Sequence, residues 1–373
     1  MYIDRRYRHR RRRSPWPIII LLLIVAGGVY LLATRTRFFK NPFNPLQPTP
    51  TPTRSALSYL AEAEDAYQAG RLAAAARAYT RASELDPAND DILIRRAWLL
   101  CLLGHPGQAV ELAQRAVAIK ASAANLTMLA MAQDWDGRYD EAIRTALKAV
   151  EQDPLSAEAR AILAEVYADR NNWTRALEEA QAAVRLNANS AIAQRNLGYV
   201  LERQGRYESA IAAFDRAAQL EPKLGYIYIS AGYSYLALGD YRNALAQFQK
   251  AMEVNPDSPV GYDAFGYGSS LAGDSDRAVS LLRKAIDIDP TYGLAYAHLG
   301  HAYYTQLNWE AVIENLNRAV SLGVRNEQYY YELGLAYAYL KDCQNAVVWL
   351  EKALELNPNS GPALQGLRLC AKG

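Results

Sequence analysis

A repeat of 34 residues runs through most of the chain. Five prolines mark it at spacings of 68, 34, 34 and 68 residues, namely Pro154, Pro222, Pro256, Pro290 and Pro358. Pro87 misses the same grid by one residue, and similar text recurs in step, as GRYDEAI at 137–143 and GRYESAI at 205–211. A fixed period of this length is typical of stacked-repeat architectures, in which each unit buries its apolar face against its neighbours.

Small residues recur at fixed places within each unit. With the proline at position 32, nine units tile residues 56–360, and the third begins one residue early. Position 8 is Gly or Ala in all nine units, position 27 is always Ala, and position 20 is Ala except for Val312. This pattern predicts two closely packed helices in each unit. A Gly at position 15 of six units predicts the turn between them, because Gly adopts the left-handed conformation without steric penalty.

The pattern resembles the tetratricopeptide repeat family over about 305 of the 373 residues. The resemblance implies an all-α fold, an α-solenoid that forms a right-handed superhelix of about nine helix-turn-helix repeats, with the first helix of each unit on the concave face. Pro106, the Lys120-Ala121 pair and Val312 depart from the pattern, so we expect local irregularity near residues 105–123. Residues 361–373 contain Leu364 and Leu367 at first-helix positions and predict a C-terminal capping helix.

The segment ahead of the repeats contains a long uncharged stretch. Eighteen residues from Trp16 to Ala33 carry no charge, and at about 1.5 Å per residue they would span roughly 27 Å. A cleaved signal peptide is the alternative, but its apolar core is usually about 7–15 residues long and precedes a small-x-small site, whereas Leu31 lies two residues before Ala33. We therefore expect one N-terminal transmembrane helix, an anchor at residues 16–34.

Arginines indicate the orientation of this anchor. Residues 1–15 form an Arg-rich tail with seven Arg, whereas only Arg35, Arg37 and Lys40 follow the apolar stretch closely. The positive-inside rule then predicts a cytoplasmic N-terminus and an extracytoplasmic repeat domain. Residues 35–55 form a Pro/Thr-rich linker, whose five prolines favour an extended, semi-rigid spacer.

Charge is distributed unevenly between the two parts of the chain. Residues 1–54 carry 11 Lys or Arg and one acid, and the remainder carries 30 Lys or Arg against 38 Asp or Glu, a net charge of −8. A negatively charged repeat domain is not expected to bind nucleic acid through its phosphates. The expected partners are instead a protein or peptide, and the lipid bilayer through residues 16–34.

Catalytic and metal-binding motifs are missing from the sequence. It contains no GxxxxGK[ST], GxGxxG, HExxH or GxSxG motif, so we expect no enzyme activity and no cofactor. His298 and His301 are three residues apart, but no third His or nearby Cys accompanies them, so a binding surface is the preferred interpretation over a zinc site.

Tyrosine is the most unusual residue in the composition. The chain has 26 Tyr against 6 Phe and 6 Trp, and 16 of these Tyr fall between residues 225 and 358. Tyr supplies a large contact area with a polar tip, which suits recognition. By the family's register, the predicted partner-binding groove contains Tyr199, Tyr226, Tyr233, Tyr267, His301, Tyr304, Tyr331 and Tyr339. Other Tyr, at positions 4 and 11 of the units, are expected to fill space between helices.

Two of the three cysteines are a candidate disulfide. Cys343 is predicted at the start of a second helix and Cys370 at the end of the capping helix, and these ends are neighbours in a helix stack. Cys101 is expected to remain free.

These features predict a membrane-anchored scaffold that binds a peptide or protein in a concave groove. Two alternatives remain open at this point: a glycan-binding or glycan-processing accessory protein that uses the Tyr groove, and a cytoplasm-facing assembly factor if the topology is inverted.

Overall fold

The computed structural model describes residues 16–38 and 54–371. The Arg-rich tail, most of the Pro/Thr-rich linker and the last two residues lie outside these ranges. The chain divides into two compact units, Met1–Arg54 and Ser55–Gly373, and each is described by itself.

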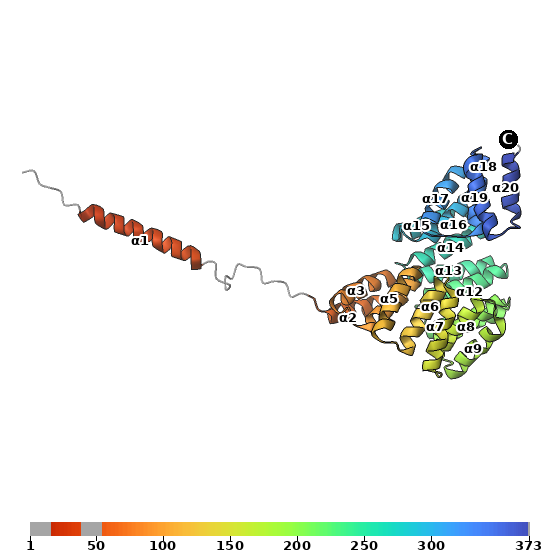
Figure 1. Cartoon of the computed structure of the whole chain (residues 1–373), viewed down its shortest axis with the longest axis horizontal. Helices are drawn as coiled ribbons and strands as arrows, with labels where there is room; N and C mark the ends of the chain where they lie inside the picture. Colours follow the sequence, from red (N-terminus) through yellow and green to blue (C-terminus); the bar gives the residue numbers. More distant parts are fainter. Residues whose placement is uncertain (1–15, 39–53, 372–373) are drawn as a thin grey trace, which may run out of the picture. The chain divides into compact units, whose positions relative to one another are not determined.

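Every regular element in the described ranges is a helix (Figure 1). The helices are α1 (Trp16–Phe38), α2 (Ala56–Gln68), α3 (Leu72–Leu85), α4 (Asp90–Leu102), α5 (Pro106–Ile119), α6 (Ala123–Trp135), α7 (Tyr139–Gln152), α8 (Ala157–Asp169), α9 (Trp173–Leu186), α10 (Ala191–Arg203), α11 (Tyr207–Leu220), α12 (Gly225–Ala237), α13 (Tyr241–Val254), α14 (Pro259–Leu271), α15 (Ser275–Ile288), α16 (Gly293–Thr305), α17 (Trp309–Ser321), α18 (Glu327–Tyr339), α19 (Cys343–Leu356) and α20 (Gly361–Ala371). Nine antiparallel pairs, α2/α3 to α18/α19, are followed by the single helix α20 at the expected cap.

Helix α1 covers the expected membrane anchor and extends four residues beyond it. Its apolar side chains are exposed along its described length, from Trp16 at 67% to Leu32 at 67%. Among the residues that the structure describes, no helix has both the length and the hydropathy that a membrane span needs. The anchor therefore stays a prediction.

The turn between the two helices of each unit has one conformation. In the first unit Gly70 has φ of +72°, its N–H donates to the Tyr67 carbonyl, and the Arg71 N–H donates to the Ala66 carbonyl. These two bonds satisfy carbonyls at the end of α2 that have no partner within the helix. Asn171, Leu307 and Lys341 adopt a similar positive φ in the three units that lack this Gly. The turn therefore has the same conformation in these units, although the left-handed conformation of a residue other than Gly is unfavourable by about 1–2 kcal/mol.

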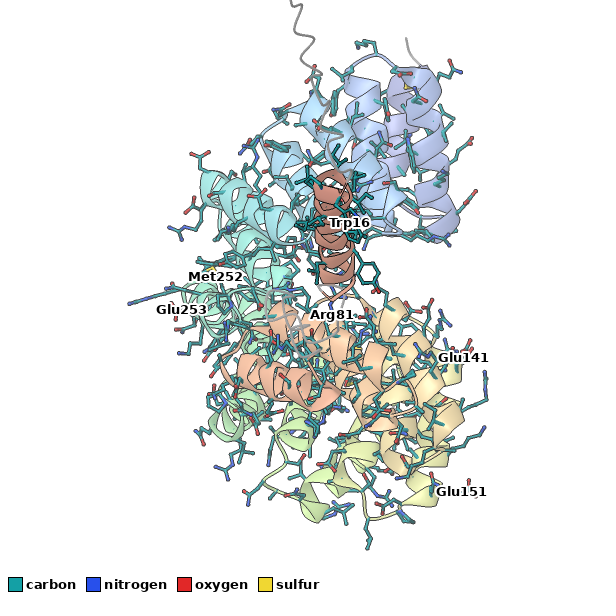
Figure 2. The ribbon with its side chains drawn as sticks, turned by 90° about the vertical axis from the view of Figure 1, so that its left-hand side faces the viewer. Trp16, Arg81, Glu141, Glu151, Met252 and Glu253 are labelled. Carbon is teal, nitrogen blue, oxygen red and sulfur yellow. A yellow bond between two sulfur atoms is a disulfide. The ribbon has the colours of Figure 1, made fainter. Side chains whose placement is uncertain are left out.

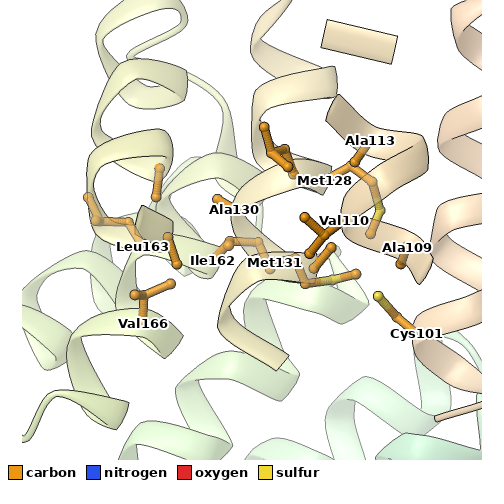
Figure 3. Close-up of a cluster of buried hydrophobic side chains, with 14 of the residues drawn as sticks. Cys101, Ala109, Val110, Ala113, Met128, Ala130, Met131, Ile162, Leu163 and Val166 are labelled. Atoms are coloured by element: carbon orange, nitrogen blue, oxygen red, sulfur yellow. The ribbon is translucent and has the colours of Figure 1, made fainter. Parts of the chain in front are cut away.

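Residue sizes at positions 8 and 24 compensate for each other inside the units. In α12 a Cβ added to Gly232 would lie 2.4 Å from the ring of Phe248 on α13, so only Gly allows that ring to fill the space. The same relation holds in the other four of the last five units, as Gly198 with Phe214, Gly266 with Leu282, Gly300 with Leu316 and Gly334 with Leu350. Units two to four have Ala at both positions, and Figure 3 shows one such core, where Ala130 lies among Met131, Ile162 and Leu163.

The region near residues 105–123 is more regular than expected. Pro106 is the first residue of α5, where its missing N–H would have had no helical partner, and α5 is as long as the other second helices except α17. The one-residue shift of the third unit is absorbed in the turn before α6. There Asn125 donates from Nδ2 to the carbonyl of Lys120 at 2.8 Å, which satisfies the end of α5. The expected irregularity is therefore limited to this shortened turn.

The second helices carry the charged outer surface. Figure 2 shows Glu141, Glu151 and Glu253 at the edge of the ribbon, on α7 and α13. These three residues and Arg81 on α3 are all exposed. The first helices contact one another in order from α4 to α18, and α18 contacts the capping helix α20. The first helices therefore line the inner, concave face.

Distant units also meet directly through their turns. Asn255 donates from Nδ2 to the carbonyl of Gly70 at 3.1 Å, and the Ala74 N–H donates to Asp257 at 3.0 Å. One apolar cluster joins residues of the first two units to Leu201, Phe214 and Ile227. The solenoid therefore closes on itself after about five and a half units, and the repeat pattern does not predict this closure.

Candidate binding groove

All eight residues of the predicted groove lie on first helices. Tyr199 is on α10, Tyr226 and Tyr233 on α12, Tyr267 on α14, His301 and Tyr304 on α16, and Tyr331 and Tyr339 on α18. Seven of them are half-buried, and Tyr339 is 46% exposed. None is a fully buried core residue. Two of the Tyr expected as filler, Tyr303 and Tyr330, are buried between helices.

Two predicted residues, Tyr199 and Tyr226, belong to a cluster that we call the Arg195 cluster: Trp135, Glu165, Arg195, Tyr199 and Tyr226. The Arg195 guanidinium pairs with Glu165 and lies over the rings of Tyr199 at 4.9 Å and Tyr226 at 5.3 Å. Trp135 donates from Nε1 to Glu165 at 3.1 Å. A cation held by one carboxylate and several aromatic faces is strongly attracted when it is desolvated, so the chain fills this part of its own groove.

A second acid lies beside this cluster. Asp134, near the end of α6, is only 3% exposed, and neither of its carboxyl oxygens accepts a hydrogen bond from a described residue. Burial, together with the charges of Glu165 and Asp169, raises the pKa of Asp134 to about 9. The raised pKa favours a proton on Asp134 at neutral pH, and a proton there lowers the repulsion among the three acids.

An apolar pocket of about 420 Å³ opens on the first helices of units two to five. Its apolar lining includes Ile94, Trp98, Met131, Ile162 and Ile192. The Tyr pattern does not predict this pocket, because these units contain few Tyr. Trp98 and Met131 are at position 9 of their units, the groove position that Tyr occupies in several later units. The position alone would therefore have predicted that both side chains line the groove.

Glu332 pairs with His301, and its charge acts on the hydroxyls of Tyr267, Tyr304 and Tyr331. We call these five residues the Glu332 cluster. Glu332 is 1% exposed, and its Oε1 lies 2.7 Å from His301 Nδ1. Tyr267 lies near His301, with ring centroids 6.1 Å apart. Burial and the Glu332 charge raise the pKa of the Tyr331 hydroxyl to about 12. Four of these five residues were predicted in the groove, and Glu332 was not.

The remaining two predicted residues, Tyr233 and Tyr339, lie outside both clusters. Tyr233 packs edge to face on Phe248, with centroids 5.2 Å apart. Tyr339 stacks on Trp309 at 4.5 Å, and Tyr304 meets the same Trp edge to face at 5.6 Å. The predicted groove is thus divided into separate patches.

The two histidines do not share a ligand. His298 Nδ1 lies 2.7 Å from the buried carboxylate of Asp263, whereas His301 pairs with Glu332. In the part of the chain that the structure describes, no three His, Cys, Asp or Glu side chains are grouped so that they could hold a metal ion.

Cys343 and Cys370 are joined as a disulfide, with Cα atoms 5.4 Å apart. The bond links the first residue of α19 to the end of α20 and so attaches the capping helix to the ninth unit. Cys101 is free and buried against Val110 in the core that Figure 3 shows.

Comparison with known families agrees with this architecture. Models of the tetratricopeptide repeat match residues 60–124, 127–191 and 166–224 and residues 225–258 and 327–360. The chain belongs to the tetratricopeptide repeat family. Proteins of this family are typically non-enzymatic scaffolds that bind protein partners. A search of curated proteins finds no match.

Solved structures share the fold at low sequence identity. The chain is similar to a chain of the APC/C hetero-tetramer Cut9-Hcn1, with 18% identity and a TM-score of 0.60 over 79% of this chain. It spans 59% of the length of that relative. It is also similar to yeast Tom70, with 17% identity and a TM-score of 0.52 over 85% of this chain and 88% of Tom70.

Proposed function

We propose that this protein is a membrane-anchored scaffold that binds a protein or peptide partner on the concave face of its solenoid. The observation that carries the proposal is the set of half-buried aromatic side chains on consecutive first helices, above all Tyr267, Tyr304 and Tyr331. Half-buried Tyr rings need little reorganisation to bind and offer both an apolar face and a hydroxyl. Cut9, one of the structural neighbours, assembles with Hcn1, so the fold is compatible with such a role.

The partner test compares two Tyr positions in the full chain purified in detergent. Tyr267→Ala and Tyr304→Ala should each weaken binding of a captured partner by about 1–2 kcal/mol. Tyr241→Ala is the matched control, because Tyr241 is 45% exposed but lies on the second helix α13. Equal retention by all three variants would exclude the groove, and selective retention of oligosaccharides would favour the glycan-binding alternative.

The topology part of the proposal rests on the charge bias around residues 16–34. We propose that these residues anchor the chain with the N-terminus in the cytoplasm and the solenoid outside it. A single Cys introduced at Thr51 should react with a membrane-impermeant maleimide in intact cells. Protection of that Cys until the cells are lysed would instead favour the cytoplasm-facing assembly factor.

A further inference from the structure

Two buried carboxylates on the concave face are each surrounded by aromatic rings, but only one of them is paired with a strong base. Glu165 holds the Arg195 guanidinium over the rings of Tyr199 and Tyr226. Glu332 bonds His301 and Gln328, and its charge reaches the hydroxyls of Tyr267, Tyr304 and Tyr331. Within the described residues, no Lys or Arg forms an ion pair with Glu332. The only basic side chain paired with it there is that of His301.

One oxygen of Glu332 is left without a partner. Its Oε1 accepts from Gln328 Nε2 at 2.9 Å and lies 2.7 Å from His301 Nδ1, whereas its Oε2 is buried and meets no hydrogen-bond donor in the described part of the chain. A buried carboxylate oxygen without a donor is unfavourable by the desolvation free energy of that group. A bound cation would remove part of this penalty.

The surrounding rings lie close enough to feel this charge. Burial first, and the Glu332 carboxylate next, raise the pKa of the Tyr267, Tyr304 and Tyr331 hydroxyls. All three rings are half-buried. One side of the Tyr267 ring stacks on His298, with centroids 4.3 Å apart, and Tyr304 meets Trp309 edge to face. The half-buried parts of the three rings are what remains for an ammonium group, which aromatic rings beside a carboxylate attract.

We propose that Tyr267, Tyr304 and Tyr331 form an aromatic cage, with Glu332 at its base, that receives the ammonium group of a lysine from an extended partner peptide. The inference rests on the proposed function and names the chemistry of its partner. The three rings come from three consecutive first helices, α14, α16 and α18, so an extended segment that crosses these helices passes all of them. The acidic solenoid, with 30 Lys or Arg against 38 Asp or Glu after residue 54, attracts a basic segment.

Arg195 is an internal precedent for this chemistry. In the Arg195 cluster the cation comes from the chain itself, at position 5 of its unit. Positions 5 of the last two units are Ala297 and Tyr331, so these units supply no cation of their own from that position. The partner's lysine would complete the second cluster in the way that Arg195 completes the first.

The test measures peptide binding to the full chain in detergent at 150 mM salt. The probes are fluorescein-labelled octalysine, octaglutamate and an uncharged Gly-Ser octapeptide, followed by fluorescence anisotropy. Octalysine should bind the wild-type chain, and the other two peptides should bind at least tenfold more weakly. Glu332→Gln, which retains a side-chain oxygen for Gln328, and Tyr331→Leu should each weaken octalysine binding about fivefold to tenfold.

Matched variants separate the cage from diffuse attraction. Glu351→Gln removes the same charge from an exposed site on α19, and Tyr241→Leu removes an exposed ring from α13, so both should bind octalysine as the wild type does. Equal weakening by Glu332→Gln and Glu351→Gln, or no binding of octalysine at all, would overturn the cage. If Glu332→Gln does not fold, as thermal melting would reveal, the double variant Tyr304→Leu, Tyr331→Leu decides in its place.

Failure of the cage differs from failure of the groove. A partner that depends on Tyr267 and Tyr304 but binds equally well without its lysines and with Glu332→Gln would leave the groove intact and exclude the cage. A partner that is indifferent to every groove Tyr would exclude both.

Discussion

Asn255 donates a hydrogen bond from Nδ2 to the backbone carbonyl of Gly70, 185 residues earlier in the chain. The two turns pack so closely that a Cβ added to Gly70 would lie 2.0 Å from the carbonyl oxygen of Val254. Lys223 reinforces the contact by donating to the carbonyl of Gln68 at 2.6 Å. These contacts close the first turn of the superhelix.

Substitution of Gly70 tests this closure against a built-in control. Gly70→Ala should destabilise the solenoid for two reasons, the positive φ and the clash with Val254. Gly239→Ala carries only the first penalty, because Gly239 has a similar φ of +74° but no atom within 4 Å of its added Cβ. In urea unfolding followed by circular dichroism, Gly70→Ala should lose about 1–3 kcal/mol more than Gly239→Ala. Equal losses would mean that the two turns do not meet in solution.

The pairing of Gly232 with Phe248 predicts a change of sign in a double-mutant cycle. Gly232→Ala alone should destabilise the protein by about 1–3 kcal/mol, because the added methyl group meets the Phe248 ring. In a Phe248→Ala background the same change should be neutral or stabilising by up to about 1 kcal/mol, because Ala is the better helix former. Chemical denaturation of the four proteins measures the coupling, and additive effects would contradict the packing.

The repeat pattern predicted the fold well because the residues that define it act on the backbone close to them in the sequence. Gly at position 15 and Pro at position 32 act within a few residues of themselves, so sequence alone identified nine helix pairs and a cap. The closure at Gly70 and Asn255 could not be predicted in this way, because it depends on small rotations between units that add up over more than five repeats.

The candidate groove was predictable only in part, for the same reason. The register placed Tyr267, His301, Tyr304 and Tyr331 on first helices, where the structure has them. The register could not show that all four are affected by the charge of Glu332, because Glu332 is at position 6 of its unit, which is not a groove position, and is buried. Arg195 also stands at a groove position, but the sequence could not show that Glu165 holds its guanidinium over the rings of Tyr199 and Tyr226.

Asp134 predicts a pH dependence of stability. Its pKa of about 9 in the folded protein lies above the value of about 4 in an unfolded chain, so between these pH values the folded state binds more protons. The free energy of unfolding should therefore fall as pH rises from about 4 to 9. Asp134→Asn, which mimics the protonated acid, should flatten this slope and stabilise the protein by about 1–3 kcal/mol at pH 7.

Urea unfolding at pH 5, 7 and 8.5 measures this effect. Asp287→Asn is the control, because Asp287 is an exposed residue of α15 and should leave the slope unchanged. A wild-type stability that rises over this range, with no difference between the two variants, would show that Asp134 is ionised in the folded protein.

The disulfide of the cap predicts a specific thiol count. Denatured, unreduced protein should take up one alkyl group, on Cys101, and reduced protein should take up three. Cys370→Ser should release α20 from the ninth unit and destabilise the cap by up to about 3 kcal/mol, as expected for a closed loop of this length. Intact mass and amide hydrogen exchange of residues 361–371 measure the two effects, and three reactive thiols before reduction would contradict the bond.

The contact between the turns of Gly70 and Asn255 also bears on how the protein is made. In an ordinary repeat array each unit needs only its neighbours, so folding can follow synthesis unit by unit. Here residues 63–103 share a core with Leu201, Phe214 and Ile227, and Gly70 bonds to Asn255, which follows it by 185 residues. At about 5–20 residues per second, the first two units wait roughly 10 to 40 s for that partner to be synthesised. During that interval the inner apolar surface of these units is exposed to solvent, and the nascent chain then depends most on chaperones to prevent aggregation.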